Sequence, residues 1–176
     1  MANKTYMVAE STLLTDARNF SMQSTKDIQN GAIVGKGDLV TGEREIYTAE
    51  DDYADGMYLV LNPAWSYESG SAKQNEENYV NKAGIAFRAY GLKKDMKFKV
   101  SNIATEFEVG DEVRYDHTTG TYVAGSSTGL KVVAVEDACF PFCIGSIGVQ
   151  VVGDDDNEYG YATGARTKKY TIEVVK

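Results

Sequence analysis

The sequence predicts an all-β fold, either a single β-barrel or a single β-sandwich. Short segments along the chain alternate apolar with polar residues, which is the period of a strand with one face in solvent. Glycine-bearing turn sequences separate these segments, and the 17 Gly and 12 Tyr against 2 Pro also favour strands and turns over helices. We expect about eight to ten strands in one domain.

The chain divides into an arm, a body and an insertion. We assign residues 1–26 to an extended N-terminal arm, residues 27–176 to the β-barrel or β-sandwich domain, and residues 64–82 to a long loop inserted in it. A chain of 176 residues is long enough for one domain with a sizeable core and such an appendage.

Charge and hydropathy limit the partners of the chain. The formal net charge of −8 opposes general attraction to nucleic acids and anionic membranes. No apolar run approaches the roughly 20 residues of a membrane-spanning helix, and the first residues lead into no signal-peptide pattern. We expect a soluble protein, made in a cytoplasm, that binds neither nucleic acid nor a membrane directly.

The predicted arm shows no sustained periodicity. Two apolar clusters, at residues 6–9 and 13–14, precede a polar run at residues 21–26. A segment with little core of its own can become ordered on a neighbour, so we expect an arm that packs on another subunit. A frayed terminus with one edge strand is the open alternative. The interface candidates of the arm are Tyr6, Met7, Leu13 and Leu14.

In the first half of the body, the pattern of apolar residues predicts strands at residues 32–35, 43–48, 57–61 and 84–90. Asn30-Gly31 is a turn signal before the first strand, which we expect Lys36-Gly37-Asp38 to end. The apolar run of the third strand suits a central strand buried on both faces. In the fourth strand, alternation predicts that one face carries Ile85, Phe87 and Ala89.

The insertion at residues 64–82 is polar and rich in loop-forming residues. Loops longer than about 12 residues are uncommon in compact domains unless they bind a partner or lack fixed structure. We therefore expect a contact segment, with a lid over one end of the barrel as the alternative. Its aromatic interface candidates are Trp65, Tyr67 and Tyr79.

The middle of the chain predicts a three-stranded meander with strands at residues 97–100, 107–109 and 113–115. Gly110-Asp111 and Thr118-Thr119-Gly120 predict tight turns, because Gly adopts positive φ at no steric cost.

The C-terminal part predicts strands at residues 130–135, 145–152 and 168–175, and the last is regular enough that we expect it to be paired. An acidic, glycine-bearing loop is predicted at residues 154–164. Tyrosine supplies a large contact area at low rotamer cost, so the remaining interface candidates are Tyr159 and Tyr161.

Three groups of residues could belong to a metal site or a catalytic site, and each has a simpler structural explanation. The carboxylates of 154–158 suit Ca²⁺ but lack the landmarks of an EF-hand loop, so we expect a solvated hairpin tip. Cys139 and Cys143 would need further zinc ligands from a chain with one histidine, so we expect two small buried side chains. His117 falls in a predicted turn without a recognisable nucleophile motif. We assign no catalytic, cofactor-binding or metal-binding residue, and an enzyme is the least expected class.

Three pieces of sequence occur together within roughly residues 27–124: 27–31 with 39–47, 78–84 with 88–90, and 107–113. Together they resemble the small structural proteins encoded near the major capsid protein in tailed phages of Gram-positive hosts. The resemblance implies a virion component, most specifically a decoration or cement protein on the capsid surface. The partner it implies is the major capsid protein, with self-association left open. The family supplies no catalytic residues.

Two other functions remain as alternatives. One is a tail or head–tail connector protein, which would be present in rings and not over the whole shell. The other is a carbohydrate-binding or host-adhesion module that uses loop tyrosines. A cement protein agrees with the physics, because a ligand that binds only the mature shell stabilises that shell by mass action.

Overall fold

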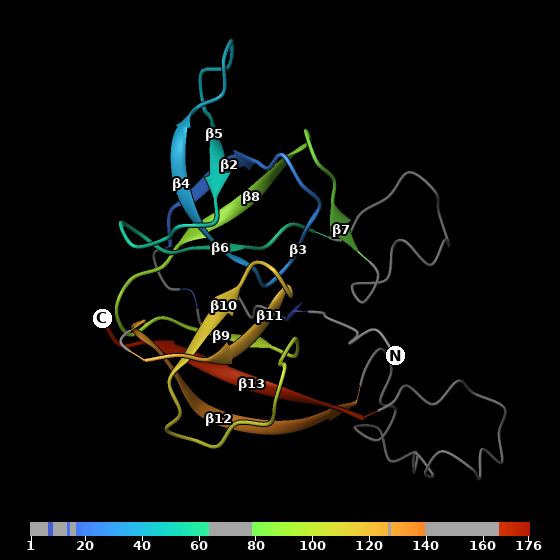
Figure 1. Cartoon of the computed structure of the whole chain (residues 1–176), viewed down its shortest axis with the longest axis vertical. Helices are drawn as coiled ribbons and strands as arrows, with labels where there is room; N and C mark the ends of the chain where they lie inside the picture. The colour runs from blue at the N-terminus through green and yellow to red at the C-terminus, as the bar shows by residue number, and fades with distance from the viewer. Residues whose placement is uncertain (1–6, 9–13, 15–16, 64–78, 127, 140–165) are drawn as a thin grey trace, which may run out of the picture.

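A computed structural model shows an all-β protein in which a closed barrel lies above a sheet (Figure 1). The structure describes residues 7–8, 14, 17–63, 79–126, 128–139 and 166–176. This part of the chain contains thirteen strands and no helix, so the predicted all-β fold is confirmed. None of it forms a helix of the length and apolarity that crossing a bilayer requires. The strands outnumber the eight to ten expected, and three of them have only two residues.

Five strands close into the barrel in the order β2-β5-β4-β6-β8. Their bounds are β2 Asn19–Gln23, β4 Ile33–Leu39, β5 Ile46–Glu50, β6 Tyr58–Val60 and β8 Ala86–Gly91. Only the β2–β5 pair is parallel; the other barrel pairs are antiparallel. Closure pairs every barrel strand on both sides, which removes exposed edges.

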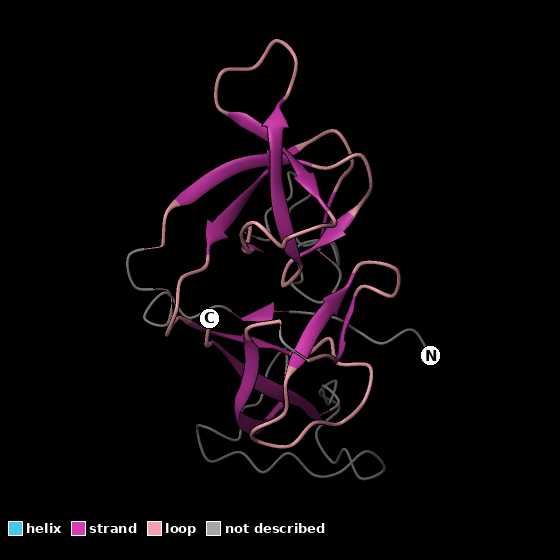
Figure 2. Ribbon diagram, turned by 60° about the vertical axis from the view of Figure 1, so that its left-hand side comes forward, coloured by secondary structure: helices cyan, strands magenta, loops and turns pink. Residues whose placement is uncertain are grey.

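A four-stranded antiparallel sheet lies below the barrel in the order β1-β9-β13-β12. Its strands are β1 Met7–Val8, β9 Lys97–Val100, β12 Leu130–Cys139 and β13 Arg166–Val174. Two small antiparallel pairs complete the fold. One joins β3 Ile28–Gln29 to β7 Val80–Asn81, and the other is the hairpin of β10 Val113–Asp116 and β11 Thr121–Ala124. Figures 1 and 2 show this hairpin between the barrel and the sheet.

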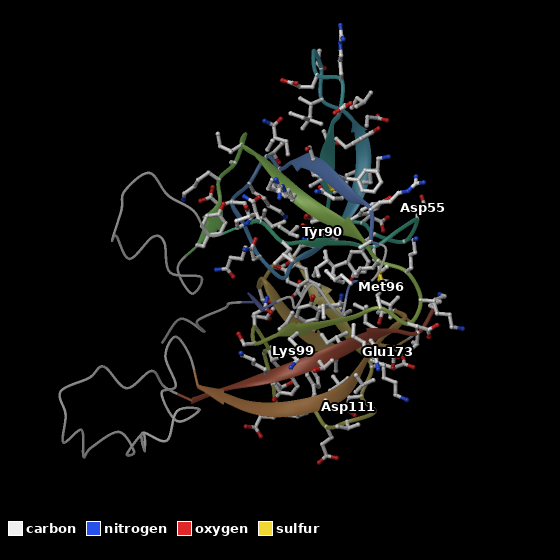
Figure 3. The ribbon with its side chains drawn as sticks, turned by 180° about the vertical axis from the view of Figure 1, so that it is seen from behind. Asp55, Tyr90, Met96, Lys99, Asp111 and Glu173 are labelled. Carbon is white, nitrogen blue, oxygen red and sulfur yellow. The ribbon has the colours of Figure 1, made fainter. Side chains whose placement is uncertain are left out.

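One hydrophobic core runs through the barrel, the hairpin and the sheet. Figure 3 shows the arrangement from behind, with Tyr90 on the barrel, Glu173 on the sheet side and Met96 between them. Met96 is buried at that level, as expected for a side chain that fills the junction. The largest fully buried side chains come from all three parts and include Met22, Ile33, Leu59, Tyr122, Phe98, Leu130 and Ile172.

The predicted arm is wrong over residues 19–23, which form a barrel strand between β5 and β8. Met22 is fully buried there, Phe20 is half-buried and Ser21 is exposed. The alternation of exposed and buried residues is therefore present, but it is short. The polar residues on either side of it made the strand difficult to predict. Residues 7–8 also pair within the chain, with β9. The remainder of residues 1–16 lies outside the described residues, except Leu14.

The first predicted strand does not end at Lys36-Gly37-Asp38. β4 continues to Leu39, with a shift of register against β5 between Lys36 and Leu39. A Cβ at Gly37 would overlap the side chains of Thr48 and Glu50, so glycine permits a close approach of the two strands. Glycine here marks a bulge and not a strand end.

The predicted meander is also wrong. β9 pairs with β1 and β13, and β10 pairs with β11, so the predicted strands at residues 97–100 and 113–115 exist but are not neighbours. Residues 107–109 form no strand, because the Asp111 carboxylate accepts a hydrogen bond from the Glu108 backbone N–H at 2.9 Å and closes a turn. Gly110 lies in that turn at φ 111° and Gly120 in the next at φ 69°, which confirms both predicted turns.

The strand predicted at residues 43–48 begins only at Ile46, because residues 43–45 belong to the hairpin turn, whereas further strand predictions agree with the structure. β6 is central in the barrel, between β4 and β8, and the C-terminal strand β13 is paired on both sides. Phe87 and Ala89 of β8 are buried as the alternation predicted, whereas Ile85 precedes the strand and is 62% exposed. The predicted strand at 145–152 lies outside the described residues.

The hydrogen bond of Tyr122 should contribute measurably to stability, because it links the hairpin to the barrel. Its buried hydroxyl donates a 2.7 Å hydrogen bond to the Gly31 carbonyl. Tyr122→Phe removes that donor and is expected to lower the free energy of unfolding by about 1–3 kcal/mol, measured by chemical denaturation. Tyr90→Phe, at a half-buried tyrosine of the barrel, is the control and should change it by less than about 1 kcal/mol. Equal effects of the two variants would contradict the role of the Tyr122 bond.

Candidate binding cleft

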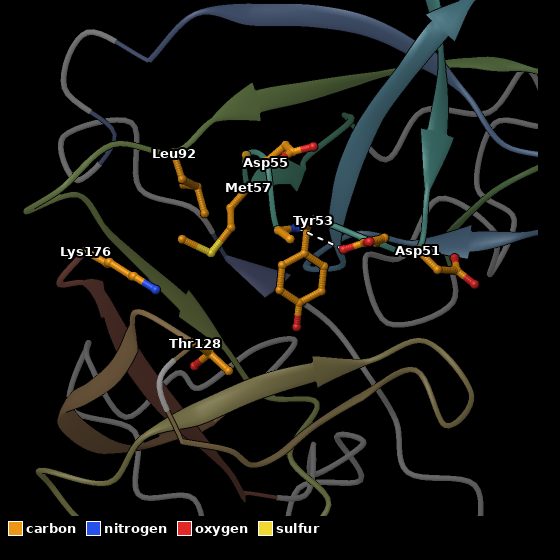
Figure 4. Close-up of a pocket in the computed structure, with 10 residues that line it drawn as sticks. Asp51, Tyr53, Asp55, Met57, Leu92, Thr128 and Lys176 are labelled. Carbon is orange, nitrogen blue, oxygen red and sulfur yellow. Dashed lines mark hydrogen bonds between the residues drawn. The ribbon is translucent and has the colours of Figure 1, made fainter.

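A cleft of about 560 Å³ lies where the barrel meets the sheet (Figure 4). One wall is the loop from Asp51 to Met57, which connects β5 to β6, and the opposite wall carries Thr128 and Lys176. Leu92, directly after β8, also lines the cleft. The size and the position between two parts of a fold are those of small-ligand sites in general.

Local hydrogen bonds and close packing hold the loop 51–57 in place. The Asp52 carboxylate accepts from the Ala54 backbone N–H at 3.0 Å, the Asx turn expected of a loop aspartate. The Leu92 N–H donates to the Met57 carbonyl at 2.8 Å, which ties the end of the loop to the chain after β8. At Gly35 of β4, an added Cβ would overlap the Asp52 carbonyl oxygen, so the loop lies directly on the strand backbone.

The cleft combines carboxylates with an apolar surface. Asp51, Asp52 and Asp55 come from one loop, and the Lys176 side chain projects from the other side (Figure 4). Met57, Leu92 and the Tyr53 ring supply apolar area. A second hollow of about 160 Å³ adjoins the same loop and shares Asp52 and Asp55. This lining suits a ligand with an apolar body and several hydrogen-bond donors, because ionised carboxylates only accept.

Three tyrosines connect the cleft to the interior. The Tyr53 hydroxyl donates to the Tyr115 carbonyl at 3.2 Å, and the Tyr115 and Tyr122 rings pack edge to face at 5.3 Å. Burial raises the pKa of Tyr53, Tyr115 and Tyr122 above the ordinary value of a phenol. All three hydroxyls therefore stay protonated at neutral pH, and those of Tyr53 and Tyr122 donate hydrogen bonds to backbone carbonyls.

His117 lies at the same junction, in the turn after β10 that the sequence predicted. Its Nδ1 is 3.2 Å from Asp51 Oδ1, and its ring packs at 4.9 Å from that of Tyr115. Burial lowers the pKa of His117, while the Asp51 carboxylate raises it, and burial is the larger influence. Only 11% of the side chain is exposed, so His117 is a packed residue of the interface more than a solvated turn residue.

A second polar cluster, the asparagine clamp, consists of Asn30, Asn62 and Asn81. Asn30 Nδ2 donates to the Asn62 carbonyl at 2.7 Å, and Asn30 Oδ1 accepts from the Asn62 N–H at 3.0 Å. Asn81 Nδ2 also donates to Asn30 Oδ1, at 3.1 Å. Beside the clamp, Asp27 pairs with Lys82 at 2.6 Å and accepts from the Ala83 N–H at 3.0 Å, and both contacts lower the Asp27 pKa. The clamp thus joins β3 to β7 and to the chain after β6.

The structure describes three of the nine interface candidates. Tyr79 directly precedes β7, and its hydroxyl accepts from Asn62 Nδ2 at 2.8 Å, so it belongs to the polar network around the clamp. Residues 80–81, predicted as loop, are the strand β7. Leu14 is 9% exposed and packs in the core of this chain, and Met7 lies in β1. The other candidates lie outside the described residues: Tyr6, Leu13, Trp65, Tyr67, Tyr159 and Tyr161.

Most of the residues considered for calcium or zinc binding lie outside the described residues. The acidic stretch 154–158 and Cys143 fall there, and Cys139 is the last residue of β12, with its side chain not described. Among the described residues no group of three His, Cys, Asp or Glu is arranged to hold a metal ion. The cleft itself was missed from the sequence, although the run Glu50-Asp51-Asp52-Tyr53-Ala54-Asp55 was a visible acidic signal.

Comparison of the chain with protein-family models, with curated proteins and with solved structures found no match.

The packing of the cleft loop predicts a strong effect of a single methyl group. Gly35→Ala forces the Asp52 backbone away from β4 and should lower the free energy of unfolding by about 1–3 kcal/mol. Gly91→Ala is the matched control, because a Cβ there meets only side-chain atoms at 3.5 Å or more. Chemical denaturation of both variants measures the difference. A Gly35→Ala protein as stable as Gly91→Ala would mean that the loop does not rest on β4.

The asparagine clamp predicts a second difference between matched variants. Asn30→Ala leaves the Asn62 N–H and carbonyl without their partner and should lower the free energy of unfolding by about 2 kcal/mol or more. Asn19→Ala, at an exposed asparagine of β2, should change it by less than about 1 kcal/mol. Thermal and chemical denaturation test this, and similar losses in both variants would argue against a structural clamp.

Proposed function

We propose that this chain is a non-enzymatic virion protein that decorates a phage capsid by binding the major capsid protein. The resemblance of residues 27–124 to phage structural proteins suggests the class. The observation that carries the proposal further is the position of one of its segments, residues 39–47. That segment forms the tip of the β4–β5 hairpin, which projects beyond the barrel at the top of Figures 1 and 2.

The hairpin tip is suited to a protein contact. Leu39 is 48% exposed, and Thr41 to Glu45 are all exposed. Two backbone hydrogen bonds shape the tip, from the Val40 N–H to the Ile46 carbonyl at 2.8 Å and from the Glu43 N–H to the Val40 carbonyl at 2.9 Å. These exposed residues contribute little to the core, so their side chains are available to contact a partner.

Two further resemblance segments belong to the body of the fold. Residues 27–31 and 79–84 include β3, β7, the Asp27–Lys82 pair and part of the asparagine clamp. The Lys36 ammonium lies 3.8 Å from the centre of the Tyr47 ring, a cation–π contact at the base of the hairpin. A rigid body that presents an exposed tip is what a cement protein requires, because an ordered contact loses less entropy on binding.

The cleft gives one alternative a specific basis. A carbohydrate offers hydroxyl donors to carboxylates and a non-polar ring face to an aromatic side chain, and the cleft supplies Asp52, Asp55 and Tyr53. A host-adhesion module would therefore use the cleft, and a decoration protein the tip. Titration of the isolated protein with bacterial cell-wall saccharides distinguishes these two functions. Only a host-adhesion module is expected to bind the saccharides saturably.

The decisive experiment is co-sedimentation with expanded, decoration-free capsids of the phage that carries this protein. We expect saturation near one copy per capsid subunit, on the order of hundreds per particle, and a more stable shell. Arg44→Ala in the tip should weaken binding by about tenfold or more, whereas Arg88→Ala, at an exposed arginine of β8, should not. Only about a dozen copies per particle would indicate a ring-forming tail or connector protein. No binding would overturn the decoration proposal and favour a tail or connector protein.

A further inference from the structure

The junction between the barrel and the hairpin contains a titratable imidazole ring that is largely enclosed. His117 is the one histidine of the chain, and it lies on the hairpin, in the turn between β10 and β11. Its neighbours across the junction belong to the barrel side: Asp51 follows β5, and Lys26 follows β2. Imidazole is the side chain whose unperturbed pKa lies closest to physiological pH.

The two ring nitrogens of His117 have different surroundings. Nδ1 lies 3.2 Å from Asp51 Oδ1, so the hydrogen on Nδ1 has an acceptor. Nε2 is buried and has no hydrogen-bond partner among the described residues. A neutral ring with its hydrogen on Nδ1 needs no second acceptor. A protonated ring carries a second N–H that is cut off from water, which is costly in a buried place.

The groups around the ring act in both directions. Asp51 is already paired with Lys26, whose Nζ lies 2.6 Å from the other carboxylate oxygen. Lys26 lowers the His117 pKa, while Asp51, the Ile33 carbonyl and Asp116 raise it. The rings of Tyr53 and Tyr115, at 6.0 and 4.9 Å, cover the imidazole, and both hydroxyls are neutral. Burial is the largest influence and favours the neutral ring.

We propose that His117 is a pH-sensitive latch, which holds the β10–β11 hairpin firmly on the barrel while its ring is neutral and loosens this junction when it is protonated. Loosening exposes the imidazolium to water and leaves Asp51 paired with Lys26. Asp51 also lines the cleft, so the latch lies beside that site. The inference rests on the geometry of the junction and holds whether or not the chain binds a capsid.

The direction of the pH dependence follows from linkage. The closed junction binds fewer protons than the open one, because the His117 pKa is lowered only in the closed form. Junction stability is therefore complete above the ordinary histidine pKa and declines as the pH falls from there toward the lowered pKa. Carboxylates that titrate at lower pH contribute in all variants and cancel in a comparison.

The test is hydrogen exchange in the full chain at about pH 7.5 and about pH 5, the range over which a histidine titrates. Protection factors, corrected for intrinsic rates, are compared between hairpin amides such as Tyr122, which bonds the Asn102 carbonyl at 2.8 Å, and amides of β2 and β8. In the natural chain we expect hairpin protection to fall relative to the barrel at the lower pH. His117→Gln, which retains an amide donor toward Asp51, should show no such selective loss. The same selective loss in His117→Gln, or equal loss throughout the natural chain, would overturn the latch.

A second measurement applies even where the glutamine variant does not fold. Because the chain has one histidine, its ring proton resonance reports the titration of His117 without assignment. Asp51→Asn removes the acceptor charge and should move the midpoint to lower pH, whereas Lys26→Met exposes His117 to the full Asp51 charge and should move it to higher pH. An unchanged midpoint in both variants contradicts the latch, because the charge of His117 would then not depend on the groups at the junction.

Discussion

The packing of Tyr122 is the constraint on which the rest of the fold depends. This side chain is fully buried, and its hydroxyl donates to the Gly31 carbonyl at the start of the barrel strand β4. Its ring contacts Tyr115 of the hairpin and Phe98 of the sheet, while its N–H bonds the Asn102 carbonyl. One residue thus connects the barrel, the hairpin and the sheet. A buried hydroxyl must find an acceptor, so these parts have one relative position that satisfies it.

The cleft and the latch lie beside that connection. The loop 51–57 lines a hollow where the barrel meets the sheet, and Tyr53 of this loop bonds the Tyr115 carbonyl of the hairpin. At the margin of the packed region lies His117, covered enough that its charge is costly and close enough to Asp51 for its neutral form to be paired. The same junction therefore contains both the cleft and the proposed latch.

The polar groups inside the fold have a different role from those of the cleft. Asn30, Asn62 and Asn81 hydrogen-bond to one another and to the backbone, which determines how β3, β7 and the chain after β6 fit together. Amide side chains carry donors and acceptors without charge, so they can be buried at lower cost than carboxylates. The charged residues remain outside, on the cleft wall and the hairpin tip. Rigidity and recognition thus use separate residues.

The sequence by itself determined the all-β class, the turns at Gly110 and Gly120, and strands such as β6, β9 and β13, because period-two alternation and the freedom of glycine act between near neighbours. It gave no sign that residues 19–23 close the barrel, nor that β9 pairs with β13 across about seventy residues. The acidic run 50–55 did not show which distant residues complete the cleft, and the contact of His117 with Asp51 was not predictable either. Only the tertiary structure decided these features, because strand partners and burial depend on which distant residues meet, and short alternating segments are compatible with many such pairings.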